Sequence, residues 1–489
     1  MSLGRRLVGD TLVYGLALGV SRAAAFALLP LFTRVFSPAE YGAYDLVTSF
    51  SRALLVPAVL GIDVGMALLF QGLEPGRRRR AASSALAVQI AWAGCLTLGL
   101  IALAPRIAGA VFGDPARQGL IVLGALLLAT QVWNNFIFNL AKWQRERGHY
   151  LLLTIGVVLL SSAASVALVV LGGLGVRGAL LGTVLGGAIF VPVGIWSSWR
   201  HLASKISLSD MLRCLRLGIP FAAAGASELA FAFLLRLLVI GAGGLAAVGI
   251  FGAVNTICSG IMLISDAFAS AWWPYALSAP ATSRVHQDAA RVMRLYAYVL
   301  VLAVALLVLF AEPLVRLLLG SGSFLPGVQL VGPFALAYWI KSVRQNGSVG
   351  LVVAGGSWLR AAVNLATVLA AVAAAYPLTG IWGGLGAAWG FAIGEATGLV
   401  LQLLLLRYYV AHVEIRATVT MALMLLLLMP IATALPTASL AITMGERLGL
   451  AVAFATSLIL LGVVRWGEIA QMAALARSTV LGALGMRQT

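Results

Sequence analysis

Charged residues are scarce in this chain of 489 residues: Asp, Glu, Lys and Arg together make up only 10% of it. Hydrophobic residues account for 61%, and the mean hydropathy is +1.01. Because soluble domains carry about 25% charged residues, this composition excludes a soluble enzyme, a secreted scaffold and a disordered chain. The composition indicates an all-α polytopic membrane protein.

Cysteine and histidine are also rare. Cys95, Cys214 and Cys258 have no paired spacing, so the sequence predicts neither a disulfide framework nor a metal site. All four histidines fall between predicted spans, which argues against a histidine metal cluster or an intramembrane proton relay. We therefore expect no metal, no cofactor and no catalytic residue.

Apolar windows long enough to cross a bilayer recur along the whole chain. A cleavable signal is not expected, because the first apolar run, about 7–36, is too long and contains Arg22. We predict about 14 transmembrane helices, at 11–33, 43–70, 81–103, 119–140, 150–172, 178–199, 217–240, 247–272, 292–310, 327–350, 359–375, 384–406, 417–435 and 448–464.

The formal charge of +17 comes from 33 Lys and Arg against 16 Asp and Glu. These cations lie in short tracts between apolar runs, so they favour a role in topology over nucleic-acid binding. If both termini are cytoplasmic, 22 of the 33 fall in inner segments and 6 in outer loops. The positive-inside rule therefore predicts cytoplasmic termini and leaves five cations inside the predicted spans.

An internal repeat divides the chain. An offset of 208 residues relates two glycine ladders, Gly178, Gly182 and Gly186 in the sixth span and Gly386, Gly390 and Gly394 in the twelfth. The ladders themselves are typical of close helix packing. Each repeat holds six spans, an even number, so the halves share one orientation and a pseudo-two-fold axis along the membrane normal.

The repeat predicts three parts. Residues 1–205 and 206–415 form two six-helix bundles, and residues 416–489 add two further spans and a tail. Because the last two spans lie outside the repeat, we expect them to be an appendage to the second bundle.

Nine charged residues lie well inside predicted spans, away from their first few residues. At about 2.5 to 3.5 kcal/mol each, they would cost roughly 22 to 32 kcal/mol facing lipid, so they must face protein or water. The cations are Arg22, Arg52, Arg236, Lys341 and Arg344, and the acids are Asp63, Glu228, Asp266 and Glu395.

Two interpretations of these charges stay open. The charges can pair across helices as buried struts, for example Asp63 with Arg22 or Glu228 with Arg236. Alternatively, the cations bind an anionic substrate, since five cations against four acids leave a positive surplus and Arg forks suit phosphate. The acids would then serve in ion pairs or in binding a coupling ion.

The second span shows how such charges can share one face. At about 100° per residue, Asp45, Arg52 and Asp63 fall within about 20° of one another on a straight helix. Pro57 and Gly61 are expected to bend this helix, so the stripe is approximate.

Four stretches resemble bacterial polysaccharide flippases of the multidrug/oligosaccharidyl-lipid/polysaccharide exporter superfamily. They are LFTRVFSPAEYGAYDLVTSF at 31–50, GIDVGMALLF at 61–70, LGIPFAAAGASELAFAFLLRLLV at 217–239, and VGIFGAVNTI at 248–257 followed by DAFASAWWPYA at 266–276. The resemblance implies two six-helix bundles around a V-shaped cavity. Members often carry an Asp-Arg pair late in the seventh span; here Leu235 replaces the acid before Arg236, and Glu228 is the expected substitute.

The resemblance also implies a function. It implies movement of a polyprenyl-pyrophosphate-linked oligosaccharide across the bacterial inner membrane for surface polysaccharide synthesis, by alternating access. Membrane lipids and a polysaccharide polymerase are the implied partners, with no nucleic acid.

Three alternatives remain. A peptidoglycan lipid-precursor flippase would need a similar basic cavity, because its substrate also carries a pyrophosphate. A drug or cation exporter of the same fold fits a basic cavity poorly. A membrane enzyme acting on lipid-linked glycans is disfavoured, because the predicted outer loops are short and hold no histidine.

Overall fold

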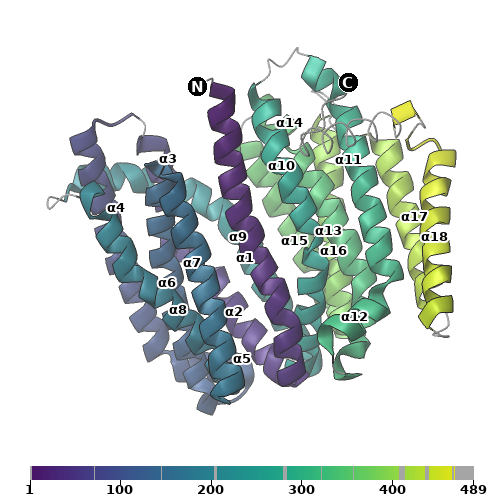
Figure 1. Ribbon diagram of the computed structural model, residues 1–489, viewed down its shortest axis with the longest axis horizontal. Coiled ribbons are helices and arrows are strands. Elements are labelled where there is room, and N and C mark those ends of the chain that lie inside the picture. The colour runs from purple at the N-terminus through teal and green to yellow at the C-terminus, as the bar shows by residue number, and fades with distance from the viewer. Residues whose placement is uncertain are drawn as a thin grey trace, which may run out of the picture.

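Nearly all of the chain is helical (Figure 1). The computed structural model describes residues 3–70, 72–144, 146–202, 206–278, 284–320, 322–355, 357–406, 414–434, 440–464 and 467–468. These ranges contain no strand, so the expected all-α fold is confirmed.

The first half of the chain forms one bundle, on the left in Figure 1. The π-helical segment η2 continues α7 by one turn. In chain order the helices are α1 (Leu3–Val35), α2 (Pro38–Val59), α3 (Ile62–Phe70), α4 (Pro75–Ala102), α5 (Ala104–Phe112), η1 (Pro115–Arg117), α6 (Gln118–Trp143), α7 (Arg147–Val166), η2 (Ala167–Leu171), α8 (Gly175–Ser198) and η3 (Trp199–His201).

Most of the second half forms the bundle on the right of the same view, with α1 passing in front of the junction, while the start of the ninth helix packs on the left, where Cys214 is buried with Ile62 and Phe70. Its helices are α9 (Leu208–Ser259), α10 (Ile261–Ser278), α11 (Arg284–Leu309), α12 (Ala311–Leu319), η4 (Gly322–Gly327), α13 (Val328–Gly347), α14 (Val349–Gly355), α15 (Ser357–Trp382), α16 (Gly384–Leu406), α17 (Ile415–Ala434) and α18 (Leu440–Leu460).

Many of these helices are long and apolar enough to cross a membrane. The described residues contain 10 such stretches, or 11 if the bent pair α2 and α3 counts as one span. One stretch, Ala226–Leu277, covers both the seventh and the eighth predicted spans. The chain is a multi-pass membrane protein, while the count of 14 spans stays a prediction.

Local sequence explains how the second predicted span begins and bends. Ser37 and Glu40 form a capping box before α2, and Pro38 occupies the first turn, where no backbone N–H is needed. At the other end Leu60 and Gly61 adopt positive φ, and α3 leaves α2 at 42°. The expected bend is therefore confirmed. A Cβ on Gly61 would lie 2.2 Å from the Gly218 carbonyl oxygen, so α9 packs directly against this bend.

Helix α9 changes direction at Gly244, whose φ of 70° and ψ of −170° favour glycine. One residue before this turn and one residue after it lie against the same carboxylate. Arg236 Nε is 2.6 Å from Asp45 Oδ2, and a Cβ on Gly252 would lie 2.3 Å from that oxygen. The two arms of α9 therefore lie side by side and correspond to the seventh span and the start of the eighth.

Both glycine ladders act as close-packing surfaces, as predicted. A Cβ on Gly182 would lie 2.3 Å from the backbone nitrogen of Ser165 on α7. In the second half, a Cβ on Gly390 would lie 2.4 Å from Cα of Ala375 on α15. Each ladder brings the last helix of its predicted repeat against the preceding one.

The two halves meet at the face opposite to the start of α1. There Thr33 Oγ1 donates to the Leu318 carbonyl at 3.3 Å, and the rings of Tyr41 and Phe324 are 6.1 Å apart, edge to face. Figure 1 shows the helices of the halves converging at this lower face and diverging toward the upper face, where α1 begins.

The C-terminal helices α17 and α18 belong to the folded body of the second half. Met421 and Leu458 are fully buried in the main hydrophobic cluster, together with Val304 of α11. Arg294 of α11 donates to Glu414 and to Glu468 at 2.7 Å, which ties both ends of this helix pair to the bundle.

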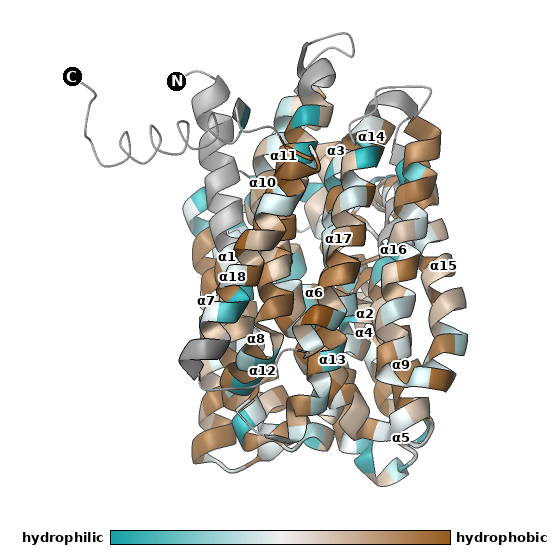
Figure 2. Cartoon of the chain, turned by 90° about the vertical axis from the view of Figure 1, so that its right-hand side faces the viewer, coloured by the Kyte–Doolittle hydropathy of each residue, from teal (hydrophilic) through white to brown (hydrophobic). Residues whose placement is uncertain are grey.

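The outward surface of the bundles is apolar. Figure 2 shows hydrophobic residues along the sides of α15 and α17, with hydrophilic residues toward the ends of the molecule. Leu369, Leu404 and Leu427 are each more than half exposed. Such a surface is stable in lipid and would aggregate in water.

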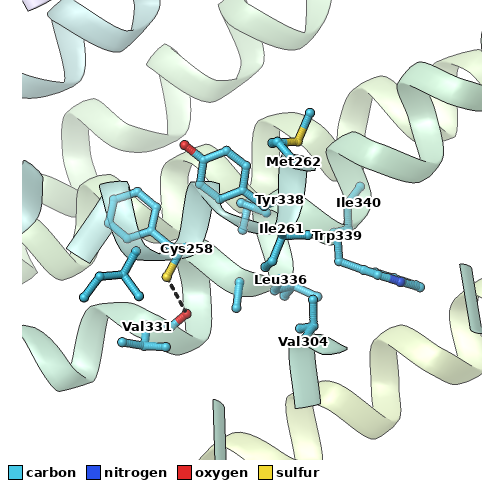
Figure 3. Packing of buried hydrophobic residues seen from close by; sticks show 14 of the residues in the cluster. Cys258, Ile261, Met262, Val304, Val331, Leu336, Tyr338, Trp339 and Ile340 are labelled. Atoms are coloured by element: carbon cyan, nitrogen blue, oxygen red, sulfur yellow. Dashed lines mark hydrogen bonds between the residues drawn. The ribbon is translucent and has the colours of Figure 1, made fainter. Parts of the chain in front are cut away.

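Figure 3 shows the hydrophobic core where α9, α10 and α13 meet. The Cys258 thiol donates to the Val331 carbonyl at 3.8 Å, and the fully buried Trp339 donates to the Ala297 carbonyl at 3.1 Å. The neighbouring Tyr338 instead donates to Asn255 Oδ1 at 2.9 Å. These hydrogen bonds and the apolar packing around them together fix the rotation of α13 about its axis.

Candidate functional site

A cavity of about 850 Å³ lies between the two halves. Its walls come from α1, α2, α6, α7, α8, α9, α10, α13, α15 and α16. All five cations that the sequence placed inside spans line this cavity: Arg22, Arg52, Arg236, Lys341 and Arg344. Charges far apart in sequence are therefore brought to one chamber.

Four of the five cations are paired with acids that also line the cavity. The pairs are Arg22 with Asp266, Arg236 with Asp45, Lys341 with Glu228, and Arg344 with Glu395. The predicted pairings of Asp63 with Arg22 and of Glu228 with Arg236 are wrong. Pairing depends on how neighbouring helices are rotated against one another, which the sequence pattern does not specify.

The pair between Arg236 and Asp45 joins the two halves. Arg236 Nε and Nη2 donate to the two carboxylate oxygens at 2.6 and 3.0 Å, and Nη1 donates to the Ala232 carbonyl at 2.7 Å. Both side chains are about nine-tenths buried. Asp45 of α2 therefore supplies the acid that Leu235 does not, and Glu228 is not the substitute.

The pair between Arg344 and Glu395 is the most deeply buried of the four. Arg344 Nε donates to Glu395 Oε2 at 2.8 Å, and Nη1 donates to Asn364 Oδ1 at 2.6 Å. The two side chains are only 5% and 6% exposed. This guanidinium is held by α15 and α16 at once, so it contributes to the rigidity of the second half.

The other two pairs are more accessible. Arg22 Nη2 lies 2.5 Å from Asp266 Oδ2, and each side chain is about one-third exposed. Lys341 pairs with Glu228, whose side chain is half exposed, and its ammonium lies 5.9 Å from the centre of the Phe391 ring. A ligand entering the cavity could reach both pairs.

Arg52 is the exception among the cations. It is exposed, lines the cavity and has no ion pair or hydrogen bond with the described part of the chain. Since the described residues that line the cavity include five cations and four acids, Arg52 carries the positive charge that no acid among them compensates. Tyr44 of the same helix also lines the cavity.

Asp63 lies apart from the other predicted residues. It is on α3 rather than α2, does not line the cavity, and makes no ion pair within the described ranges. The bend at Leu60 and Gly61 explains the difference, because a straight helix would have kept Asp63 on the same stripe as Asp45 and Arg52. Its helix α3 packs against α9, where a Cβ on Gly65 would lie 2.3 Å from the Cys214 carbonyl oxygen.

The opposite wall of the cavity is polar but neutral, and the sequence reasoning missed it. Asn134 of α6 donates to the Gly187 carbonyl at 3.2 Å, while its Oδ1 and the Oε1 of Gln131 are buried without a partner. Ser165 of α7 and Thr183 of α8 share a hydrogen bond of 3.1 Å. The 3-residue spacing of Gln131 and Asn134 in an apolar span was the available signal.

No three metal-ligating side chains among the described residues lie close enough together to hold a metal ion. The described side chains that line the cavity offer charge compensation and hydrogen bonding. One wall presents paired charges, the other presents amides and hydroxyls, and Arg52 adds a free guanidinium.

This fold and cavity define a multi-pass membrane protein whose two halves enclose a charged central cavity. The family model described as polysaccharide biosynthesis protein matches residues 7–279, more than half of the chain. The chain belongs to that family. No curated protein gives a significant sequence match.

Solved structures show the same fold at low sequence identity. The lipid II flippase MurJ in an inward closed conformation has a TM-score of 0.74 and 12% identity, covering 93% of this chain and 100% of that one. An inward-facing multidrug resistance MATE family transporter has a TM-score of 0.58 and 17% identity, covering 81% and 94%. The chain therefore shares the fold of these two transporters.

A third solved structure concerns the polarity of the pocket. A MOP superfamily transporter from Pyrococcus furiosus Vc1 (DSM3638) has a TM-score of 0.57 and 16% identity, covering 82% of this chain and 95% of that one. Its description states that reversed polarity of the binding pocket suggests a different function.

Proposed function

We propose that this protein is a flippase that moves a polyprenyl-pyrophosphate-linked oligosaccharide from the cytoplasmic to the outer leaflet of the bacterial inner membrane, by alternating access. The observation that carries the proposal is the composition of the central cavity, with one surplus cation, Arg52, beside paired charges and opposite a neutral hydrogen-bonding wall. The family model for polysaccharide biosynthesis proteins supports the substrate class.

Arg52 is proposed to bind the pyrophosphate first. It is the cavity cation with no carboxylate to displace. Arg22 is about one-third exposed, and Glu228, the partner of Lys341, is half exposed, so both cations can exchange their carboxylates for phosphate oxygens, which charge-assisted hydrogen bonds favour. Arg236 and Arg344 are buried and already bonded, so they would act by holding the cavity together until the halves move.

The neutral wall is proposed to solvate the sugar. The unpartnered oxygens of Gln131 and Asn134 accept hydrogen bonds, and sugar hydroxyls are donors that would satisfy them. The prenyl chain would stay in lipid between the halves. In this arrangement the cationic side chains would contact the pyrophosphate, and the amide side chains on the other wall would contact the sugar.

Access would alternate by rocking of the two halves. With cytoplasmic termini, as the positive-inside rule predicts, the halves are closed at the outer face, where Thr33 contacts Leu318 and Tyr41 contacts Phe324. Opening outward requires these contacts and the pair between Asp45 and Arg236 to separate. A negative-inside potential favours outward movement of two negative charges by roughly 4.6 kcal/mol per 100 mV.

A peptidoglycan precursor flippase is the second candidate, supported by the close structural likeness to the lipid II flippase. The cavity fits either lipid-linked pyrophosphate. A cation exporter is less well supported, because the cavity carries a net positive charge.

The decisive variant is Arg52→Gln. Export of surface polysaccharide in cells, and transport of the lipid-linked repeat unit in proteoliposomes, should fall at least about tenfold, the effect of losing one charge-assisted contact. Arg79→Gln, at an exposed arginine outside the cavity, should export normally. Normal export by the Arg52 variant would refute the phosphate role; rescue of a lipid II flippase deficiency without polysaccharide export would favour the second candidate.

A further inference from the structure

A second cavity, of about 580 Å³, lies within the second half and shares no lining residue with the central one. It is enclosed by α11, α12, η4, α13, α16, α17 and α18, near the lower face in Figure 1, where α12 lies. Its volume falls in the range of small-ligand pockets, about 300 to 1,000 Å³. The central transport cavity does not account for it.

Arg447 of α18 lines this cavity and lacks the partners that a buried guanidinium needs. It is 2% exposed, and its Nε and Nη1 are buried without a hydrogen-bond partner among the residues that the structure describes. Its nearest acid is Glu312 of α12, whose Oε2 lies 3.7 Å from Nη2, too far for a hydrogen bond. A buried charge in this state is strongly unfavourable unless an anion or another acceptor completes it.

Glu312 does not neutralise the cavity. Its Oε1 already accepts hydrogen bonds from Arg316 Nε and Nη2 at 3.0 and 2.9 Å. Two guanidinium groups therefore share one carboxylate, which leaves the cavity with a net charge of +1. The site is complementary to an anion with a single negative charge.

The remaining walls are apolar and reach the molecular surface. Leu385, Trp389 and Met429 line the inner part, while Arg316 and Thr433 are exposed at the mouth. A ligand that fits needs both an anionic group and apolar chains. In a bilayer, a phospholipid with a phosphodiester headgroup has this combination and carries one negative charge.

We propose that this cavity binds the phosphodiester headgroup of an anionic membrane phospholipid. The phosphate lies against Arg447, Arg316 holds it at the mouth, and the acyl chains run along α16 and α17 toward the lipid. Since α18 supplies Arg447 and α12 supplies Arg316, the bound lipid ties the C-terminal helix pair to the second bundle.

The test is lipid binding by the purified full-length protein, measured by native mass spectrometry and by the shift of its thermal unfolding midpoint. The probes are phosphatidylglycerol, phosphatidylcholine, undecaprenyl phosphate and inorganic phosphate. Phosphatidylglycerol should bind and raise the midpoint, while phosphatidylcholine and inorganic phosphate should not. Arg447→Gln should weaken phosphatidylglycerol binding about 10- to 100-fold, as expected for hydrogen bonds to a charged group.

A second variant separates a binding site from a structural strut. Glu312→Gln removes the competing carboxylate, so it should tighten phosphatidylglycerol binding several-fold. If Arg447 only supported α12 through Glu312, this variant would lower the midpoint and leave lipid binding unchanged, which would overturn the proposal. Arg416→Gln, at an exposed arginine outside the cavity, is the control.

Other outcomes also overturn the proposal. Unchanged phosphatidylglycerol binding by Arg447→Gln would show that the guanidinium is not the ligand. Full stabilisation by inorganic phosphate alone would assign the cavity to a free anion, and preference for undecaprenyl phosphate would assign it to the transported class of lipid. None of these measurements depends on export, so they are independent of the central cavity.

Discussion

The two walls of the central cavity are both built on helices packed through a glycine ladder, but their side chains differ in charge. The wall from α6, α7 and α8 is neutral, while the wall from α13, α15 and α16 holds Lys341, Arg344 and Glu395. The offset of the glycine ladders relates cavity positions across the walls: Gly187 corresponds to Glu395, since 395 − 187 = 208, and Thr130 to Tyr338, since 338 − 130 = 208. Repeated backbone positions thus face one another with unlike side chains.

The two halves therefore share their helix packing but differ in the side chains that line the cavity. Helix packing is shared, because Gly182 and Gly390 make equivalent close contacts in the two halves. The side chains at the cavity are not shared, so the chamber is asymmetric. An asymmetric chamber suits a ligand with a charged end and a neutral polar end, as the proposed substrate has.

The largest effect on stability and export is expected from disrupting the most buried ion pair of the charged wall. Glu395→Gln would leave Arg344 charged, buried and without its acid, so the free energy of unfolding should fall by about 3 to 5 kcal/mol. Export should be lost. Thermal unfolding of the purified protein and export in cells measure the two effects.

Two further variants sharpen this test. Replacing both partners, Arg344→Met with Glu395→Leu, should restore much of the stability without restoring export, since it removes the charges together. Glu74→Gln, at an exposed acid with no side-chain cap bond, should change neither property. Equal stability of Glu395→Gln and the native protein would mean that the pair does not hold the wall together.

The sequence predicts the members of this charged wall better than their partners. All five cations gather in the cavity because a charge inside an apolar span must avoid lipid, whatever the fold. The partner of Arg236 could not be predicted in the same way. Asp45 and Asp63 occupy one stripe of an ideal helix, and only the bend at Leu60 and Gly61 decides which of them faces the cavity.

The neutral wall was harder to predict for a different reason. Amides and hydroxyls such as Asn134 and Ser165 cost little in a span when they bond to a neighbouring helix, so they do not interrupt an apolar pattern. Their role depends on which direction the helix faces. The glycine ladders, by contrast, could be interpreted from sequence, because a four-residue spacing of glycines predicts close helix packing. The structure confirms that packing.

An intermediate effect is expected where the halves are alike. Gly182→Ala and Gly390→Ala place a Cβ within 2.4 Å of a backbone atom, so each should lower the free energy of unfolding by about 1 to 3 kcal/mol. Gly94→Ala and Gly99→Ala in α4 meet no atom within 4 Å, and each should be stabilising by about 0.5 to 1 kcal/mol through helix propensity. Chemical or thermal unfolding measures whether each substitution lowers or raises the free energy of unfolding. If only one of the two ladder variants is destabilised, the ladders are not equivalent.

The smallest effect on stability, and the most selective effect on function, is expected at the neutral wall. Asn134→Leu removes a free acceptor and one hydrogen bond to Gly187, so the free energy of unfolding should change by only about 1 kcal/mol. Transport of the lipid-linked oligosaccharide in proteoliposomes should fall several-fold, whereas transport of polyprenyl pyrophosphate without sugar should stay normal. Asn139→Leu on the same helix, away from the cavity, is the matched control. Because Arg52→Gln should reduce both substrates equally, a uniform loss with Asn134→Leu would mean that the two walls do not divide the ligand between them.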